Sequence, residues 1–258
     1  MCSSDLVKVR TGERDLHSGM YGGAALNAIH VLMGCFEAVL AGPDGRLPES
    51  LRQGIAAPTA AELEAWAALP PGADEMRNQG ARPLDSKAEE EFYVRTWAEP
   101  SADVNGIIGG KPGLRNTTLS VQASGEFTVR LAPGQDVQTI GAAAERLVRD
   151  AAPEGAEVDV QWAGAPPGLV KPESPVIQLG LRAFERVLGV RPLLVRSGGT
   201  LPIMPALGDK GIPTILTGFG LPESNVHSPN ERFLVRYFEQ GVDTAAALFT
   251  ALGELSPT

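Results

Sequence analysis

The sequence predicts an α/β protein whose first half is α+β and whose second half is part of a parallel-sheet α/β layer. Strand-like alternation of apolar residues is concentrated in the first half, where two amphipathic helical stretches interrupt it. A Pro-Pro-Gly break at 166–168 marks a change, after which helices alternate with short apolar segments. These observations predict two domains, covering residues 1–163 and 164–258.

The first domain is expected to have five strand segments and two main helices. Apolar spacing places helices at 24–40 and 135–152, and strands at 6–10, 103–109, 116–123, 126–132 and 156–162. Ser124-Gly125 predicts a hairpin turn between two of these strands. Without the insertion, and with the two hairpin segments counted with 103–109 as one antiparallel set, the order is strand, helix, strand, strand, helix, strand. This order predicts a ferredoxin-like split βαβ arrangement.

An irregular insertion is predicted within this domain at about 43–100, because the segment is rich in proline and alanine. A short helix is expected at 60–69. Ser86 followed by Glu89 resembles a capping box, which predicts a second helix ending near Trp97.

The second domain is expected to alternate helices with two short parallel strands. The helices are placed at 174–188, 201–207 and 233–252, and the strands at 193–196 and 214–217. Two strands do not form a stable sheet alone, and the strand at 6–10 begins almost at once. We therefore expect the chain to be part of a larger protein.

Composition excludes several classes of function. The chain has 258 residues, a formal net charge of −9 and 43% hydrophobic residues. An acidic chain repels nucleic acid and anionic lipid, and the apolar runs are too short to span a bilayer, so no nucleic-acid or membrane partner is expected. The two cysteines do not make a disulfide scaffold, which indicates a cytoplasmic protein, and Cys35 is expected to be a core residue.

Two of the three histidines lie where chemistry is plausible. His227 follows a predicted buried strand, where α/β proteins place ligands, and is either a metal ligand or a solvated loop residue. His17 lies between a strand and a helix and is either an oxyanion donor or a capping residue. His30 is expected to be a half-buried helix residue.

Two further groups could bind an anion. Ser197, Gly198, Gly199 and Thr200 follow Arg196 between a strand and a helix, where backbone amides can approach an anion closely, although any tight turn can use two glycines. Arg130 ends a strand and could clamp a carboxylate with two hydrogen bonds or form a surface ion pair.

Together, these segments resemble the M20 family of metallopeptidases, in particular its dipeptidase and carnosinase-like branch. The likeness runs from residue 6 to the end, and its blocks fall in family order. They are Arg14-Asp15-Leu16-His17-Ser18-Gly19-Met20-Tyr21-Gly22-Gly23; Val104–Gly110 with Asn116–Leu119 and Phe127–Pro133; Arg196-Ser197-Gly198-Gly199-Thr200-Leu201-Pro202; and Gly218–Gly220 through Glu231.

The resemblance implies that residues 1–163 are the lid or dimerisation domain and that 164–258 are the C-terminal part of the catalytic domain. It implies His227 as a metal ligand and His17 as the donor that stabilises the tetrahedral oxyanion in the partner subunit. It also implies substrate contacts from Arg130, Asn105, Thr117 and the 197–200 loop. The resemblance also implies a divalent metal in the full-length parent, as a pair of Zn²⁺ ions or of Mn²⁺ or Co²⁺.

Two hypotheses about function remain open from the sequence. In the first, the chain is part of a homodimeric, metal-dependent hydrolase that cleaves dipeptides or small N-acyl amino acids, and it is inactive alone because the other ligands and the general-base glutamate lie before the lid in this family. In the second, it is a non-catalytic dimerisation module or pseudoenzyme. A His-x-Asp and Glu-Glu pair upstream of this chain would decide for the enzyme.

Overall fold

The computed structural model describes residues 2–111, 113, 117–168, 170, 172–196, 203–226 and 229–255. These residues divide into two compact units. Unit 1 comprises the chain up to Ala57 and Val94–Pro167; unit 2 comprises Pro58–Tyr93, Gly168–Arg196 and the described residues from 203 onward. Most of the predicted insertion thus groups with the C-terminal helices.

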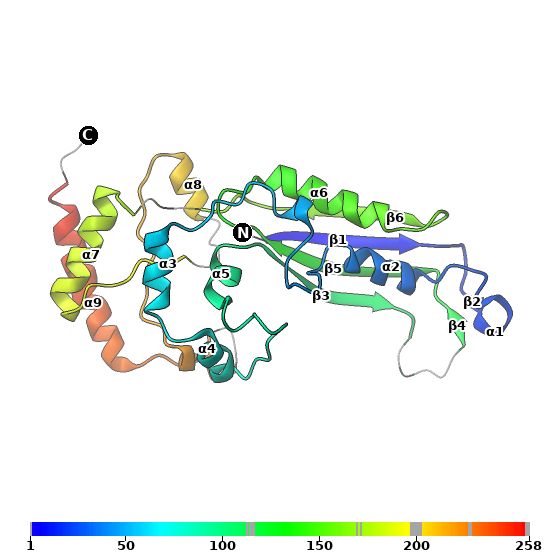
Figure 1. The fold of residues 1–258 in the computed structure, drawn as a ribbon, viewed down its shortest axis with the longest axis horizontal. Helices are drawn as coiled ribbons and strands as arrows, with labels where there is room; N and C mark the ends of the chain where they lie inside the picture. The colour runs from blue at the N-terminus through cyan, green and yellow to red at the C-terminus, as the bar shows by residue number, and fades with distance from the viewer. Residues whose placement is uncertain are drawn as a thin grey trace. The chain divides into compact units, whose positions relative to one another are not determined.

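Unit 1 is built on a four-stranded antiparallel sheet (Figure 1). Its strands are β1 (Cys2–Arg10), β3 (Ser101–Gly109), β5 (Gln122–Arg130) and β6 (Glu157–Ala163), in the order β3-β5-β1-β6. β5 is central, because it pairs with β1 along one side and with β3 along the other. The two edges of this sheet are β3 and β6.

Two helices, α2 (Ala28–Glu37) and α6 (Val137–Asp150), pack on one face of the sheet and form the core of unit 1. Alternate residues of β1 and β5 face these helices, among them Val7, Phe127 and Val129, each with no exposed surface. Cys35 is fully buried here, as expected, and burial raises the pKa of its thiol. The opposite face of the sheet is polar.

The hairpin predicted around Ser124-Gly125 is wrong, because both residues lie inside the continuous strand β5. Gly125 is there for close packing. A Cβ on residue 125 would lie 2.7 Å from Cζ of Phe36 and 2.7 Å from the carbonyl oxygen of Gly106. Ser124-Gly125 therefore does not mark a turn. It marks a position inside a strand against which an aromatic ring packs closely.

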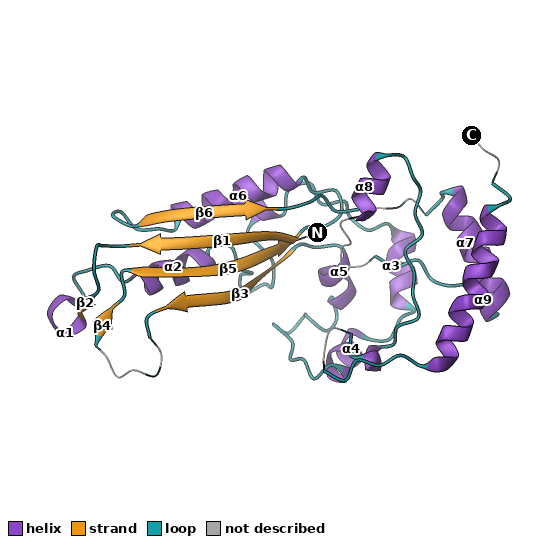
Figure 2. Ribbon diagram, turned by 180° about the vertical axis from the view of Figure 1, so that it is seen from behind, coloured by secondary structure: helices purple, strands orange, loops and turns teal. Residues whose placement is uncertain are grey.

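A second, two-stranded sheet lies at the end of the main sheet where β1 ends and β5 begins (Figure 2). It pairs β2 (Leu16–His17) with β4 (Thr118–Leu119), and the short helix α1 (Ser18–Tyr21) follows β2 directly. The 116–123 segment predicted as one strand is thus divided between β4 and the start of β5.

Gln135 fastens the segment after α2 to the sheet of unit 1. Its side chain is buried, accepts the amide of Ala132 at 2.9 Å and donates to the carbonyl of Leu51 at 2.8 Å. Leu51 ends the 3₁₀ helix η1 (Glu49–Leu51) and is fully buried. This part of the predicted insertion is therefore held to the sheet.

Unit 2 is helical in its described residues. Its helices are α3 (Ala60–Ala67), α4 (Gly72–Asn78), α7 (Pro175–Leu188), α8 (Ile203–Asp209), the 3₁₀ helix η2 (Pro222–Ser224) and α9 (Val235–Leu252), while α5 (Phe92–Trp97) crosses the boundary between the units. Leu179, Ala183 and Ala251 join α7 to α9. The capping box is at Thr59 and Glu62, at the start of α3, and not at Ser86 and Glu89, which lie in turns.

The parallel sheet predicted for the second half is wrong for the described residues, since neither 193–196 nor 214–217 is a strand. A strand is stabilised by hydrogen bonds to neighbouring strands, and these segments have none beside them within the described part of unit 2. Their apolar side chains are left exposed, with Val195 at 51% and Leu216 at 54%. Among the described residues, no helix combines the length and the apolar character needed to cross a membrane.

We predict that Gly125→Ala destabilises unit 1 by about 1–3 kcal/mol, because the added methyl group must displace the Phe36 ring or the backbone of β3. Urea unfolding followed by circular dichroism measures the change. Gly34→Ala is the matched control: a Cβ there meets nothing within 4 Å in helix α2, so stability should be unchanged or higher. Equal stability of Gly125→Ala and the parent chain would contradict the packing role.

Candidate functional site

His17 lies on the surface at a sharp change of chain direction. It ends β2, pairs with Thr118 of β4 and is the N-cap residue of α1. The next amide, that of Ser18, donates to the carbonyl of Thr117 at 2.6 Å, so both strands are fixed beside the histidine. The side chain is exposed, as a residue that contacts another molecule must be.

Both ring nitrogens of His17 have polar neighbours. Nδ1 accepts the backbone amide of Gly19 at 3.0 Å, and Nε2 lies 3.4 Å from Oγ1 of Thr117. The structure therefore brings together two of the predicted site residues, His17 and Thr117. The capping function and the donor function weighed for His17 are compatible, because they use different ring nitrogens.

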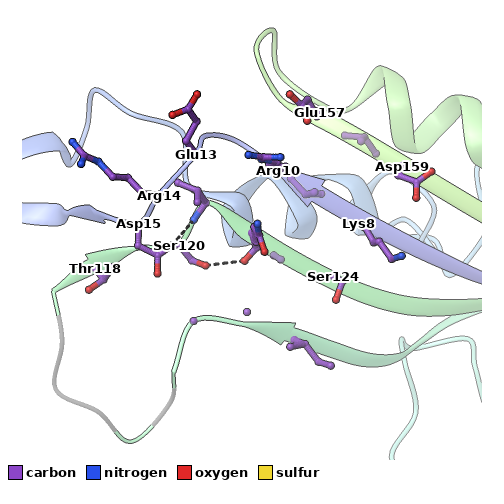
Figure 3. Close-up of a pocket in the computed structure, with 18 of the residues that line it drawn as sticks. Lys8, Arg10, Glu13, Arg14, Asp15, Thr118, Ser120, Ser124, Glu157 and Asp159 are labelled. Atoms are coloured by element: carbon purple, nitrogen blue, oxygen red, sulfur yellow. Dashed lines mark hydrogen bonds between the residues drawn. The ribbon is translucent and has the colours of Figure 1, made fainter.

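Asp15 supports this corner and was missed as a functional candidate. Its Oδ1 accepts the amide of Val121 at 3.1 Å, which ties the chain before β2 to the chain after β4 (Figure 3). Its closeness to His17 was visible in the sequence, since Asp15 stands two residues before it in the Arg14–Gly23 block. An aspartate that closes a loop through a backbone amide has no spacing rule by which to recognise it.

Asn105 lies at an irregular point of edge strand β3. The pairing with β5 passes from Val104 opposite Phe127 to Gly106 opposite Glu126, so Asn105 is the extra residue of a β-bulge. Bulges re-aim side chains at sheet edges and next to sites. Asn105 is exposed, and the structure does not bring it beside His17.

Arg130 lies at the other end of the sheet from His17. It is the last residue of β5 and is paired with Cys2 and Ser101, whereas His17 lies beyond Gln122, where β5 begins (Figure 2). A strand rises by about 3.3 Å per residue, which separates the two ends of β5 by roughly 26 Å. His17 and Arg130 of one copy therefore do not contact one small substrate.

A hollow of about 1080 Å³ lies on the polar face of the main sheet, next to the β2–β4 corner (Figure 3). Its charged lining is balanced. The cations are Lys8, Arg10, Arg14 and Lys111, and the anions are Glu13, Asp15, Glu157 and Asp159. Lys8 faces Asp159 and Arg10 faces Glu157 across the β1–β6 pairing, so the hollow has no excess charge that would select an anion or a cation.

His227 and the loop Ser197, Gly198, Gly199 and Thr200 lie outside the described residues. Across the part of the chain that the structure describes, no three His, Cys, Asp or Glu side chains come together as a metal site would require. The described residues thus do not supply the donor set of a zinc centre.

Arg196, immediately before that loop, is held firmly within unit 2. Its guanidinium forms two hydrogen bonds to Glu62, at 2.7 and 3.0 Å, and lies over the ring of Trp66. The side chain is only 9% exposed. Glu62 also closes the capping box with Thr59, and the hydrogen bonds from Arg196 hold the pKa of this carboxyl below its usual range.

Comparison with known proteins bears on this geometry. Residues 4–156 match the M20 family description "Peptidase dimerisation domain", which covers most of unit 1 and more than half of the chain. The chain belongs to the M20 peptidase dimerisation-domain family. The resemblance inferred from the sequence motifs is thereby confirmed.

The proteins to which this M20 chain is similar include dipeptidases and a carboxypeptidase. It is 23% identical to human Beta-Ala-His dipeptidase over 97% of its own length and 51% of the relative's. It is 27% identical to Cysteinylglycine-S-conjugate dipeptidase of Corynebacterium striatum, over 87% of this chain and 49% of that protein. An M20 metallo-carboxypeptidase from Sulfolobus solfataricus has the same fold, with a TM-score of 0.83, 20% identity and coverage of 98% and 59%.

The chain spans about half the length of the curated relatives that it matches. The relatives indicate a hydrolase parent family, and membership of a metallopeptidase family indicates dependence on a divalent metal in a complete M20 enzyme. The number and identity of the metal ions stay predictions, as do the roles of the individual residues.

We predict that Glu62→Gln lowers the stability of unit 2 by about 1 kcal/mol at neutral pH, because it weakens the charged pair with Arg196. The pKa of Glu62 is lowered in the folded state, so this contribution is present above the pKa of the unfolded chain and is lost as the pH falls through the folded value. Urea unfolding at several pH values should show the difference disappearing in acid.

Glu64→Gln is the control for this experiment, since Glu64 is an exposed residue of the same helix α3. Its effect should be small and should not follow the same pH dependence. A Glu62→Gln difference that persists unchanged in acid would show that the ion pair is not its source.

Proposed function

We propose that this chain is the lid and the C-terminal catalytic part of an M20 hydrolase that cleaves the amide bond of dipeptides or similar small N-acyl amino acids. The observation that carries the proposal is the exposed His17, fixed at the β2–β4 corner with Nδ1 bonded to the amide of Gly19 and Nε2 beside Oγ1 of Thr117. The dipeptidase names of the relatives support the substrate class. The ferredoxin-like description of unit 1 belongs to the same proposal and agrees with its strand order.

In this proposal His17 donates a hydrogen bond to the negative oxygen of the tetrahedral intermediate. A preorganised donor acts mainly on the transition state, where the charge on that oxygen is largest. Thr117, at 3.4 Å from Nε2, is placed to contact the same substrate. Neither residue needs to exchange a proton with the substrate for this purpose.

Arg130, Asn105 and the 197–200 loop would bind the substrate's terminal carboxylate. An arginine can hold a carboxylate with two parallel hydrogen bonds. The two ends of β5 are separated by roughly 26 Å, whereas an extended dipeptide spans only about 7 Å. His17 and Arg130 of one copy must therefore serve two different substrates, which supports a homodimer in which His17 reaches the partner's site.

The metal centre of this hydrolase would lie mostly outside the described residues. His227 would supply one ligand, and the remaining ligands and the general-base glutamate would come from sequence that precedes the lid in this family. The described residues bring no three metal-binding side chains together. The proposal for this chain accordingly rests on hydrogen bonding by His17 and on the homodimer. The cytoplasmic location of the protein also stays a prediction.

The exposed apolar surface of unit 2 supports the interpretation as part of a larger catalytic domain. On α9, the exposed fractions are 78% for Val235, 66% for Phe238 and 75% for Phe249. Large exposed apolar patches mark surfaces that another element covers. Further parts of a catalytic domain would cover a surface of this kind.

The alternative is a dimerisation module without activity in any context. It agrees with the lack of a three-residue metal cluster among the described residues, as the enzyme proposal also does. The first proposal predicts activity when upstream sequence supplies the missing ligands, and the alternative predicts none. Assays of the parent with its upstream sequence therefore decide between them.

The isolated chain should hydrolyse no dipeptide, because one imidazole does not replace the three or four ligands that zinc requires. The measurement is release of amino acids from Cys-Gly and β-Ala-His by the purified chain in zinc, manganese or cobalt. The full-length parent, treated identically, is the control and should be active. Turnover by the isolated chain after metal loading would contradict the expected division of ligands.

Mixing two inactive variants of the full-length parent should restore activity. A His17→Ala and a His227→Ala homodimer each lack one group in every site, whereas their heterodimer has one site with both. With free exchange of subunits, heterodimers are about half of the population. Loss of one oxyanion donor typically lowers kcat by about 10²–10³, so recovery is readily measured. Heterodimers verified by mass but without recovered activity would rule out the action of His17 on the partner's site.

A further inference from the structure

We propose that Gly19 and Thr117 are positioning residues that hold the His17 imidazole in a single tautomer, with its proton on Nε2. The inference rests on the proposed function for its catalytic meaning, but the tautomer itself is a property of this chain alone. Three contacts at the β2–β4 corner carry it.

The first contact is the hydrogen bond between Gly19 and the ring. A backbone N–H can only donate, and it points to Nδ1 of His17 with an N···N distance of 3.0 Å. Nδ1 must therefore present a lone pair. In a neutral imidazole one nitrogen accepts and the other carries the proton, so the proton is on Nε2.

The second contact explains why residue 19 is a glycine. A Cβ at this position would lie 2.9 Å from Cε1 and 3.1 Å from Nδ1 of His17. The 2.9 Å distance is shorter than real Cβ contacts, so with a side chain at residue 19 the ring would have to shift away from the amide. The imidazole thus lies directly over residue 19, in the space that a side chain would fill.

The third contact is made by Thr117 on the neighbouring strand. Its Oγ1 lies 3.4 Å from Nε2, and its own carbonyl accepts the amide of Ser18 at 2.6 Å. The backbone of residue 117 is thereby fixed, and its hydroxyl oxygen can accept from the Nε2 proton. The ring is held from both sides: one neighbour donates to it and the other accepts from it.

This arrangement matters for a residue that must stabilise an anion. A ring with the opposite tautomer would direct a lone pair from Nε2 toward the substrate oxygen and would repel it. With the proton fixed on Nε2 before a partner arrives, no change of tautomer is needed during the reaction, and the substrate oxygen takes the place of Oγ1 of Thr117 as the acceptor of that proton.

The test is nitrogen NMR on the ¹⁵N-labelled chain at a pH about two units above 6.5, the ordinary histidine pKa. We expect His17 to show a protonated Nε2, an unprotonated Nδ1 and a scalar coupling across the hydrogen bond between Nδ1 and the amide nitrogen of Gly19. His30, an exposed residue of α2, is the internal reference for an unconstrained ring. A protonated Nδ1 on His17, or tautomer populations equal to those of His30, would overturn the proposal.

Substitutions at Gly19 and at Thr117 test the two positioning roles one at a time. Gly19→Ala should abolish the coupling and lower the Nε2–H to Nδ1–H ratio by about 2- to 10-fold, the range for one net hydrogen bond. Thr117→Val should lower the ratio less, and Thr117→Ser should restore it. Gly34→Ala should leave it unchanged, since a Cβ there meets nothing within 4 Å. Ratios that do not respond to either Gly19→Ala or Thr117→Val would contradict the positioning roles.

The measurement on the unmodified chain is decisive even if Gly19→Ala does not fold. It is also independent of the mixing experiment on the parent. A fixed Nε2–H tautomer without recovery of activity in the mixed dimers would reject the action of His17 on the partner and leave this inference standing. The reverse result would reject the inference and leave the proposed function standing.

Discussion

The central position of β5 is the constraint on which the arrangement of unit 1 depends. β5 pairs with β1 over its whole length and with β3 on its other side, and its inward residues meet α2 and α6. This strand also fixes the two ends at which candidate residues lie. Arg130 ends it, and β4, which leads into it, directly follows Thr117 and pairs with the strand of His17. The close approach of the Phe36 ring to Gly125 keeps the helix layer near enough to bury Phe127 completely.

Local sequence patterns predicted the elements that carry their own periodicity. Helices α2, α6, α7 and α9 follow from apolar spacing at 3.6 residues, and β1, β3 and β6 follow from alternation. The pattern failed at Gly125, because a glycine whose added Cβ would lie 2.7 Å from an aromatic ring resembles a glycine required by a turn. It also failed at 193–196 and 214–217, where apolar composition predicts strands whose formation depends on neighbours.

The sequence predicted the residue types of the candidate site but not how these residues are arranged in space. His17 stood out because the chain has three histidines and this one lies in a glycine-rich turn. Its contact with Thr117 joins residues a hundred positions apart, and only the β2–β4 pairing brings them together. Asp15 and Gly19 act through a backbone amide and through the space left by a missing side chain, respectively. Neither kind of contact produces a residue spacing that can be recognised in the sequence.

The balanced hollow on the polar face of the sheet has a consequence for how copies of this chain meet in solution. The whole chain carries a net charge of −9, yet the four cations and four anions around the hollow cancel. The repulsive charge is therefore carried by the remaining surface. Two molecules that approach with these faces turned toward each other experience weaker long-range repulsion than in other orientations, and added salt changes that approach least. Orientation during a diffusive encounter is thus biased before any contact forms.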